Sequence, residues 1–303
     1  MKKTLITIVG PTAVGKTLFA IDLALKFNTE IISADSRQIY RQLKIGTAKP
    51  TYDQLALVKH HFIGYLNIDQ DFNAGIFEKR AIETILDIFT RNDIAIMCGG
   101  SGLYINAVCN GIDNIPIVEP GLRELLITTF EKDGLAPLIN ELKLHDPQYY
   151  KQVDRCNPQR IIRALEVIRS TGKPYSKFRK RKNPNRPFRI IKIGLELDRS
   201  ELYDSVDKRM DMMIKNGLFD EAKELFSYKA LNALQTVGYK EIFGYLDGEY
   251  GKAEAIRLLK RNSRRYAKRQ LTWFKKDGEV QWFNAEKIDA IRNYIDMEIN
   301  VTG

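Results

Sequence analysis

One octapeptide near the start of the chain constrains the fold more than any other part of the sequence. Residues 10–17 match the pattern G-x-x-x-x-G-K-[ST] in full: Gly10, Pro11, Thr12, Ala13, Val14, Gly15, Lys16 and Thr17. A short apolar, β-branched run (4–9) precedes the motif, and a segment with helical periodicity (17–27) follows it. This order is typical of a phosphate-binding loop, whose backbone N–H groups and helix N-terminus point at the anion. Lys16 adds positive charge, and the Thr17 hydroxyl can hold Mg²⁺.

Further strands and helices alternate through the first third of the chain. Residues 30–33 and 94–98 have the pattern of short buried strands, and residues 77–89 that of an amphipathic helix. Strands that alternate with helices predict a parallel, doubly wound sheet, so the fold class is α/β.

The pattern changes after this sheet-forming region. Between 113 and 187 there are three helical stretches and no convincing strand; the helices are expected at 122–132, 135–143 and 158–170. Residues 189–197 again have a strand pattern, 199–276 are helical with breaks at Gly217, Gly238, Gly244 and 248–251, and 280–283 has the pattern of a last strand. We therefore predict a discontinuous core, 1–112 and 188–303, with a helical insertion at 113–187.

The positive charge of the chain is concentrated in two segments. The chain has 303 residues and a formal net charge of +10. No acidic residue lies between Glu166 and Glu196 or between Glu254 and Asp277, whereas both segments are rich in Lys and Arg. Such clusters indicate a polyanionic partner such as nucleic acid, and the alternative is an ordinary solvated basic face.

Composition excludes several other classes. Three cysteines without a C-x-x-C pair argue against a disulfide framework and a cysteine zinc site. The adjacent His60 and His61 lie in a strand-like stretch and point to opposite faces, so we interpret them as structural. No apolar run is long enough for a membrane helix, and the N-terminus lacks a signal-peptide cleavage site. We expect a reduced, cytoplasmic protein that has no membrane partner.

The first candidate for chemistry is Asp35, directly after the second strand. The strand at 94–98 ends in Gly99-Gly100-Ser101 and lacks the acid with which motor ATPases and GTPases hold their metal. Because the carboxyl ends of parallel strands meet at one edge, Asp35 is expected to face the phosphate loop. It can deprotonate an acceptor nucleophile or bind Mg²⁺, and the alternative is a helix N-cap. The acceptor is either a small molecule, as in a kinase that uses ATP, or a large anion, which the basic segments favour.

Several motifs, in order and spread through nearly the whole chain, resemble the tRNA dimethylallyltransferases (tRNA isopentenyltransferases). They are GPTAVGKT (10–17), ISADSRQIYRQLKIGTAKP (32–50), GGSGLY (99–104), NPQRIIRALEVIRSTG (157–172), ELYDSVDKRMDMMIKNGL (201–218), VGYKEI (237–242) and YAKRQLTWF (266–274). The resemblance implies transfer of a dimethylallyl group from dimethylallyl diphosphate to N6 of adenosine 37, beside the anticodon of tRNA. It also implies a monomer with a phosphate-loop NTPase-like core whose loop holds the donor diphosphate rather than ATP, and an inserted helical domain that grips the tRNA anticodon stem-loop.

The resemblance also implies roles for single residues. Asp35 falls on the general base of the family, and Arg209 on an arginine that lies near the diphosphate; the alternative for Arg209 is an exposed side chain paired with Asp207 or Asp211. Ser101 stands where the family usually has Thr, so a hydroxyl that can contact phosphate or nucleotide is retained, with looser rotamer control.

Two stretches fall on the tRNA-contacting positions of the family. The first consists of Asp35 itself and the residues that follow it, Ser36, Arg37 and Gln38, with Ser101 as a further position. The second contains Gln159, Arg160, Ile161, Ile162 and Arg163, and Arg123 matches a further position. The basic segment 257–276 would add backbone contacts, and its aromatic residues Tyr266, Trp273 and Phe274 are expected in the core. Two alternatives remain, a small-molecule kinase that uses ATP and a non-catalytic RNA-binding module.

Overall fold

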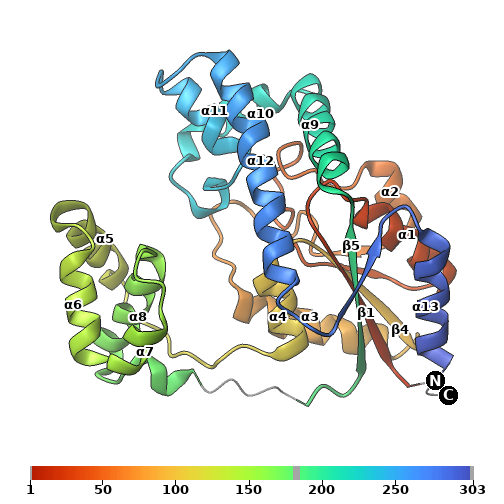
Figure 1. The fold of residues 1–303 in the computed structure, drawn as a ribbon, viewed down its shortest axis with the longest axis horizontal. Helices are drawn as coiled ribbons and strands as arrows, with labels where there is room; N and C mark the ends of the chain where they lie inside the picture. Colours follow the sequence, from red (N-terminus) through yellow and green to blue (C-terminus); the bar gives the residue numbers. More distant parts are fainter. Residues whose placement is uncertain (1, 180–184, 301–303) are drawn as a thin grey trace. The chain divides into compact units, whose positions relative to one another are not determined.

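The computed structural model describes residues 2–179 and 185–300, which contain a six-stranded parallel sheet (Figure 1). The strand order is β3-β2-β4-β1-β5-β6, and every neighbouring pair is parallel. The strands are β1 (Thr4–Val9), β2 (Ile31–Ser33), β3 (His60–His61), β4 (Ile94–Cys98), β5 (Arg189–Glu196) and β6 (Val280–Asn284). The predicted α/β class with a parallel sheet is confirmed.

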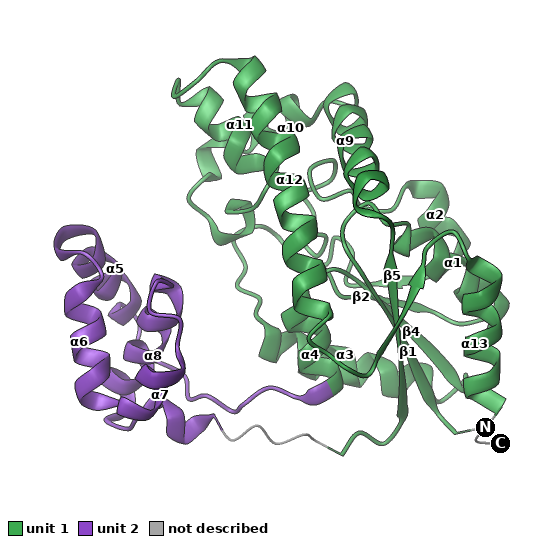
Figure 2. Cartoon of the chain, viewed as in Figure 1, with its two compact units in different colours: residues 1–109, 185–303 green, residues 110–184 purple. Residues whose placement is uncertain are grey.

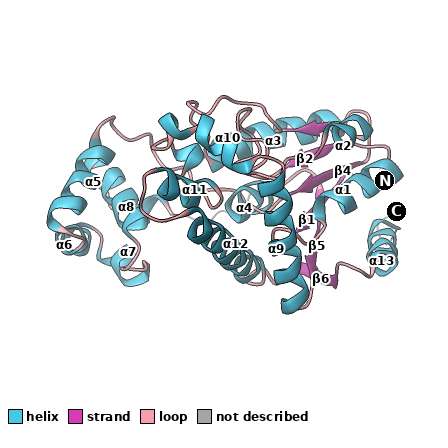
Figure 3. Ribbon diagram, turned by 90° about the horizontal axis from the view of Figure 1, so that it is seen from above, coloured by secondary structure: helices cyan, strands magenta, loops and turns pink. Residues whose placement is uncertain are grey.

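Helices cover both faces of the sheet, as parallel strands require (Figure 3). Side chains alternate along β1: Leu5 packs with α3 (Ala74–Ile88) and α4 (Gly102–Asn110), whereas Ile6 packs with α1 (Lys16–Lys26) and α13 (Ile288–Asn300). Because β1, β2 and β4 run parallel, their carboxyl ends lie at the same edge of the sheet, where the phosphate loop begins.

The second half of the core is helical. It contains α9 (Arg199–Lys215), α10 (Leu218–Glu224), α11 (Tyr239–Leu246), α12 (Lys252–Phe274) and the 3₁₀ turns η2 (Phe226–Tyr228) and η3 (Asn232–Leu234). Gly217 and Gly238 precede helices as predicted, but the predicted break at Gly244 is wrong, because this residue lies inside α11. A Cβ atom at Gly244 would lie 2.3 Å from the Tyr250 hydroxyl, so close packing rather than chain reversal requires glycine there.

The chain divides into two compact units, residues 1–109 with 185–303 and residues 110–184 (Figure 2). The second unit contains α5 (Leu122–Asp133), α6 (Ala136–His145), α7 (Pro147–Gln152), α8 (Pro158–Thr171) and the turn η1 (Tyr175–Phe178). Its apolar core includes Leu126, Leu138, Leu142 and Leu165. Lys180, Arg181 and Lys182, which belong to the first acid-free segment, lie outside the described residues.

Two of the residues predicted to contact tRNA have side chains that are buried inside this helical unit. Ile161 and Ile162 are 0% and 1% exposed and belong to the unit's apolar core. Their backbone groups lie within α8, where the intrahelical ladder uses them. Within the motif, Ile161 and Ile162 therefore pack into the core, whereas Gln159 and Arg160 are exposed.

The sequence patterns did not predict α2 (Tyr52–Leu57), α4, α7 or α13. The short helix α2 buries none of its residues, so no apolar periodicity marks it. Within 2–179 and 185–300, no helix combines the length and the apolar content that a membrane span needs.

Candidate active site

The phosphate loop connects β1 to α1 and has the backbone geometry that its glycines allow. Gly10 has φ +148°, and a Cβ atom there would lie 2.5 Å from the Leu195 carbonyl oxygen of β5. Gly15 is left-handed, with φ +95°, and precedes the first turn of α1. The Lys16 ammonium donates to the Pro11 carbonyl at 2.6 Å, and burial lowers the pKa of Lys16 to about 8. This half-buried cation and the first N–H groups of α1 form a site for an anion.

Arg209 reaches the same loop from α9. Its Nη2 donates to the Thr12 hydroxyl, while its Nε is buried and has no hydrogen-bond partner in the described part of the chain. Burial lowers the pKa of Arg209. The alternative of an exposed arginine paired with Asp207 or Asp211 is wrong, because these carboxylates accept from Arg264 and Lys260. A buried guanidinium N–H without an acceptor is costly unless a ligand supplies one.

Asp35 follows β2 and is held by its own turn. Its Oδ1 accepts the N–H groups of Arg37 at 2.8 Å and Gln38 at 3.2 Å. The predicted alternative of a helix N-cap is wrong, because residues 36–39 form a turn rather than a helix, and this turn uses one carboxylate oxygen only. Because that oxygen is fixed by the turn, the carboxylate is also oriented, and Asp35 lines the cavity beside the phosphate loop.

Ser101 supports this turn from the end of β4. Its hydroxyl accepts the N–H of Ser36 at 2.8 Å and donates to the Ser36 hydroxyl at 3.1 Å. A Cβ atom at Gly99 would lie 2.2 Å from the Ala34 carbonyl oxygen, so the ends of β4 and β2 approach as closely as glycine allows. Ser101 thus contacts the residue next to Asp35. A contact of its hydroxyl with phosphate or nucleotide, which the resemblance implies, stays a prediction.

Helix α12 contributes two residues that the sequence did not assign to the site, Gln270 and Tyr266. The buried Gln270 accepts the Thr12 N–H at 2.8 Å and donates to the Gly100 carbonyl at 3.0 Å, so it joins the phosphate loop to the loop after β4. The Thr12 N–H therefore already has an acceptor within the protein. Tyr266 was expected in the core, but it lines the site, and burial raises its pKa to about 12.

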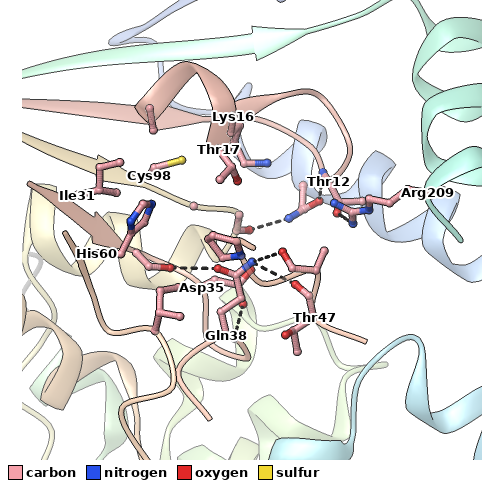
Figure 4. A pocket seen from close by; sticks show the side chains of 18 of the residues that line it. Thr12, Lys16, Thr17, Ile31, Asp35, Gln38, Thr47, His60, Cys98 and Arg209 are labelled. Carbon is pink, nitrogen blue, oxygen red and sulfur yellow. Dashed lines mark hydrogen bonds between the residues drawn. The ribbon is translucent and has the colours of Figure 1, made fainter. Parts of the chain in front are cut away.

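Two cavities meet at these residues. The first cavity contains the phosphate loop, with Lys16 and Thr17, and extends to Gln38, Thr47 and His60 (Figure 4). The second cavity has an apolar wall formed by Met210, Met213, Leu218 and Val237. The residues that line both cavities are Thr12, Asp35, Thr47, Arg209 and Tyr266. Two ligands, one in each cavity, would therefore meet beside the Asp35 carboxylate.

His60 was interpreted as structural, but it lines the first cavity at the end opposite Arg209 (Figure 4). Its Nδ1 lies 2.8 Å from the Val58 carbonyl, which can only accept, so Nδ1 carries the proton. In the neutral ring, Nε2 is then an acceptor, and it has no partner among the described residues. His61 points elsewhere and bonds to Glu30 at 2.6 Å, so the two rings do face apart as expected.

The predicted tRNA-contacting residues fall into two groups. In the core, Arg37 donates to the Asn232 carbonyl at 2.7 Å, and the Gln38 amide donates to the Thr47 and Ala48 carbonyls at 3.1 Å each. In the helical unit, the exposed Gln159 and Arg160 begin α8. The second group has an organising residue that the sequence did not reveal, the buried Glu166.

Glu166 is 1% exposed and accepts from two arginines of the helical unit. Arg123 donates to it at 3.1 Å and to Gln159 at 2.6 Å, and Arg163 donates to Glu166 at 3.3 Å. One buried carboxylate thereby holds two guanidinium groups side by side on partly exposed helix faces.

The fold and the site define a phosphate-loop α/β protein in which a carboxylate lies between two cavities. A family model described as IPP transferase matches residues 38–277, and the chain belongs to this family. The tRNA dimethylallyltransferase of Cytophaga hutchinsonii is 49% identical over 299 residues, which cover 99% of this chain and 98% of that protein.

Solved structures agree with this assignment. The tRNA isopentenylpyrophosphate transferase of Bacillus halodurans is 39% identical, with a TM-score of 0.72, and the match covers 99% of this chain and 97% of that one. A eukaryotic dimethylallyltransferase acting on tRNA is 27% identical, with a TM-score of 0.77, over 93% of this chain and 74% of that one.

Proposed function

We propose that this protein transfers the dimethylallyl group of dimethylallyl diphosphate to N6 of adenosine 37 in tRNA and releases diphosphate. The observation that carries the proposal is the wall shared by the two cavities, where Asp35, Thr12 and Arg209 face both. The first cavity would hold the donor diphosphate at the phosphate loop, and the second would hold the adenine against its apolar wall. The family's prenyl-transferring members favour this function over the small-molecule kinase that uses ATP.

Asp35 would act as the general base. The lone pair of adenine N6 is delocalised into the ring, so the amine becomes nucleophilic as its proton leaves. The oxygen of Asp35 that the turn does not use would take this proton while N6 bonds to C1 of the prenyl group. Ser101 would act as a positioning residue, because its hydroxyl holds Ser36 and hence the turn that orients Asp35.

The leaving diphosphate would be stabilised by preorganised positive charge. Lys16 and the first N–H groups of α1 face it from the phosphate loop, and the unpartnered Nε–H of Arg209 faces it from α9. These groups are in place before the C1–O bond breaks, so little reorganisation is needed during the reaction.

The residues also suit Mg²⁺. Thr17 and Asp35 offer oxygen ligands in the first cavity. The described residues contain no cluster of three or more His, Cys, Asp or Glu residues that could hold a metal ion. A site with only one or two oxygen ligands from the protein is typical of Mg²⁺, which keeps several waters and also binds substrate phosphates. Thr17 would hold the ion, and the ion would neutralise diphosphate charge.

The tRNA anticodon stem-loop would be bound by two sets of residues. The first set follows Asp35 in the chain: Arg37 lines the second cavity, Gln38 lines the first, and Ser36 precedes them. The second set belongs to the helical unit and consists of Arg123, Gln159, Arg160 and Arg163. Bases in a loop are recognised once they are unstacked and turned outward, which matches a base site inside a cavity. We propose that the protein acts as a monomer in the cytoplasm.

Incubation with dimethylallyl diphosphate, Mg²⁺ and unmodified tRNA, followed by nucleoside mass spectrometry, tests this function. We expect N6-dimethylallyladenosine from the wild type. Asp35→Asn should lower the rate by about 10²–10⁴-fold, since a general base contributes that much. Asparagine keeps the Oδ1 acceptor of the turn, so tRNA binding should be retained. Phosphate transfer from ATP with no prenylated nucleoside would instead support the kinase alternative.

A further inference from the structure

A buried carboxylate binds the backbone of a segment that lines both cavities. Glu221 of α10 is 9% exposed, and its Oε2 accepts the N–H groups of Lys44 at 3.0 Å and Ile45 at 2.8 Å. Its Oε1 accepts the N–H of Gly46 at 2.9 Å and the hydroxyl of Tyr239 at 2.6 Å. A carboxylate has about four acceptor positions, so these four donors saturate it.

Packing reinforces these hydrogen bonds. Tyr239 is fully buried, and its ring lies so close to Gly46 that a Cβ atom there would be 2.5 Å from the ring. Only glycine permits this approach, so the backbone at 46 rests directly on the phenol. Glu221 and Tyr239 therefore form one clamp, in which the carboxylate binds the amides and the ring supports the chain.

The same segment is held from the cavity side by Gln38. The Gln38 amide nitrogen donates to the carbonyls of Thr47 and Ala48, the two residues that follow the clamped amides. Residues 44–48, which we name the wall segment, are thus fixed by three N–H bonds on one side and two C=O bonds on the other. Gly46 and Thr47 line the second cavity, and Thr47 and Ala48 line the first.

We propose that Glu221 and Tyr239 are positioning residues for the acceptor base, an inference that rests on the proposed function. The clamp fixes the wall segment. Because Gln38 bonds to this segment, the clamp also fixes the position that the acceptor base takes beside Asp35. None of the four donors to Glu221 is a charged group, so the carboxylate orders backbone rather than pairing with a cation. A base displaced by about 1 Å from its reactive position reacts on the order of 10²-fold more slowly.

The test compares three variants in single-turnover prenylation with saturating tRNA and donor. Glu221→Gln replaces an acceptor oxygen by an NH₂ group that faces backbone N–H groups. Tyr239→Phe removes one donor and keeps the ring against Gly46. Glu224→Gln changes the same residue type at an exposed position of the same helix and is the matched control. Hydrogen exchange at the amides of 44–46, donor affinity and the midpoint of thermal unfolding are measured alongside.

Glu221→Gln should lower the single-turnover rate by about 10–10²-fold. Amide exchange at 44–46 should become faster, and the affinity for the donor should stay unchanged. Tyr239→Phe should have a smaller effect in the same direction, and Glu224→Gln none. Unchanged exchange at 44–46 with a wild-type rate would overturn the proposal. If Glu221→Gln lost donor affinity and thermal stability in parallel with its rate, the proposal would also be overturned, because the role of Glu221 would then be purely structural. If the wild type forms no prenylated adenosine, the proposed function fails, while the exchange experiment still tests the clamp.

Discussion

The active-site cations and those of the helical unit have different partners. In the core, Lys16 donates to a carbonyl and Arg209 to a hydroxyl, so both contact neutral acceptors. In the helical unit, Arg123 and Arg163 share the buried carboxylate of Glu166. The pKa values of Lys16 and Arg209 are lowered by burial, which shows that the core holds its positive charge at a cost.

This difference separates two ways to use positive charge. A buried cation with neutral partners keeps its full attraction for an anionic ligand, and the ligand removes the cost of burial. A cation that already shares a carboxylate is held in a fixed place, and the carboxylate reduces the net charge of the group. Such an arrangement suits a surface that positions a large anion. The predictions below test this contrast, from the largest expected effect to the smallest.

Lys16→Met should have the largest effect. The substitution removes the half-buried positive charge beside the proposed leaving group and keeps a side chain of similar length. We expect the prenylation rate to fall by about 10³-fold, the upper end of what one preorganised donor supplies. Lys26→Met, at the other end of α1 in an exposed pair with Asp296, is the matched control and should leave the rate unchanged. A normal rate in Lys16→Met would show that the charge of the loop is not used.

Arg209 allows charge to be separated from geometry. Arg209→Gln should lower the rate by on the order of 10²-fold, because both the charge and the Nε–H are lost. Arg209→Lys keeps the charge but lacks the forked donor set, so about a tenfold loss is expected. Calorimetric titration with a non-reactive donor analogue gives the accompanying loss of affinity, and the exposed neighbour Lys208→Gln serves as control. Equal effects of the two Arg209 variants would mean that geometry alone matters.

Much of the fold could be predicted because its signals are local. The strands β1 and β4 were predicted with their observed bounds, since each is a continuous buried run. Helix α8 begins at Pro158 as predicted, after a capping Asn157 whose side chain accepts the N–H of Arg160. Apolar periodicity could not reveal α2, because this helix buries none of its residues. The capping box that Thr51 and Gln54 form was the signal that could have revealed the helix.

The site was predicted where one motif contains its residues and missed where distant segments meet. Lys16 and Asp35 each belong to a short pattern after a strand. Gln270 contacts Thr12 across 258 positions, and Glu221 contacts Gly46 across 175, and no local pattern encodes such contacts. The burial of Ile161 and Ile162 was missed for the opposite reason, because a motif gives the order of residues but not which face of the helix is buried.

The lowered pKa of Lys16 predicts how donor binding depends on pH. A bound diphosphate favours protonated Lys16, so the pKa of this group is higher in the complex than its value of about 8 in the free protein. Affinity is therefore full below the free-state pKa and declines as the pH rises above it. Between about pH 7 and pH 9 we expect a roughly tenfold loss for a donor analogue, with proton uptake on binding at the upper end.

Calorimetry in two buffers of different ionisation enthalpy measures this uptake directly. Lys16→Met is the control, since its affinity should be weak but flat over the same interval. A wild-type affinity that does not change with pH would mean that Lys16 stays protonated without the ligand, and that the contrast between the two sets of cations is smaller than burial implies.

Arg163→Ala in the helical unit should have the smallest effect, and on a different quantity. Loss of one phosphate contact should weaken tRNA binding about fivefold and reduce the slope of log Kd against log salt by about 0.7–0.9. Donor affinity should not change, whereas Arg209→Gln should change donor affinity and leave the tRNA salt slope intact. Glu166→Gln gives the sharper test: the arginines lose their shared anchor but keep their charge, so the salt slope should persist while affinity declines. If Arg163→Ala lowered donor affinity as well, the two sets of cations would serve one site, and the division of labour between them would be wrong.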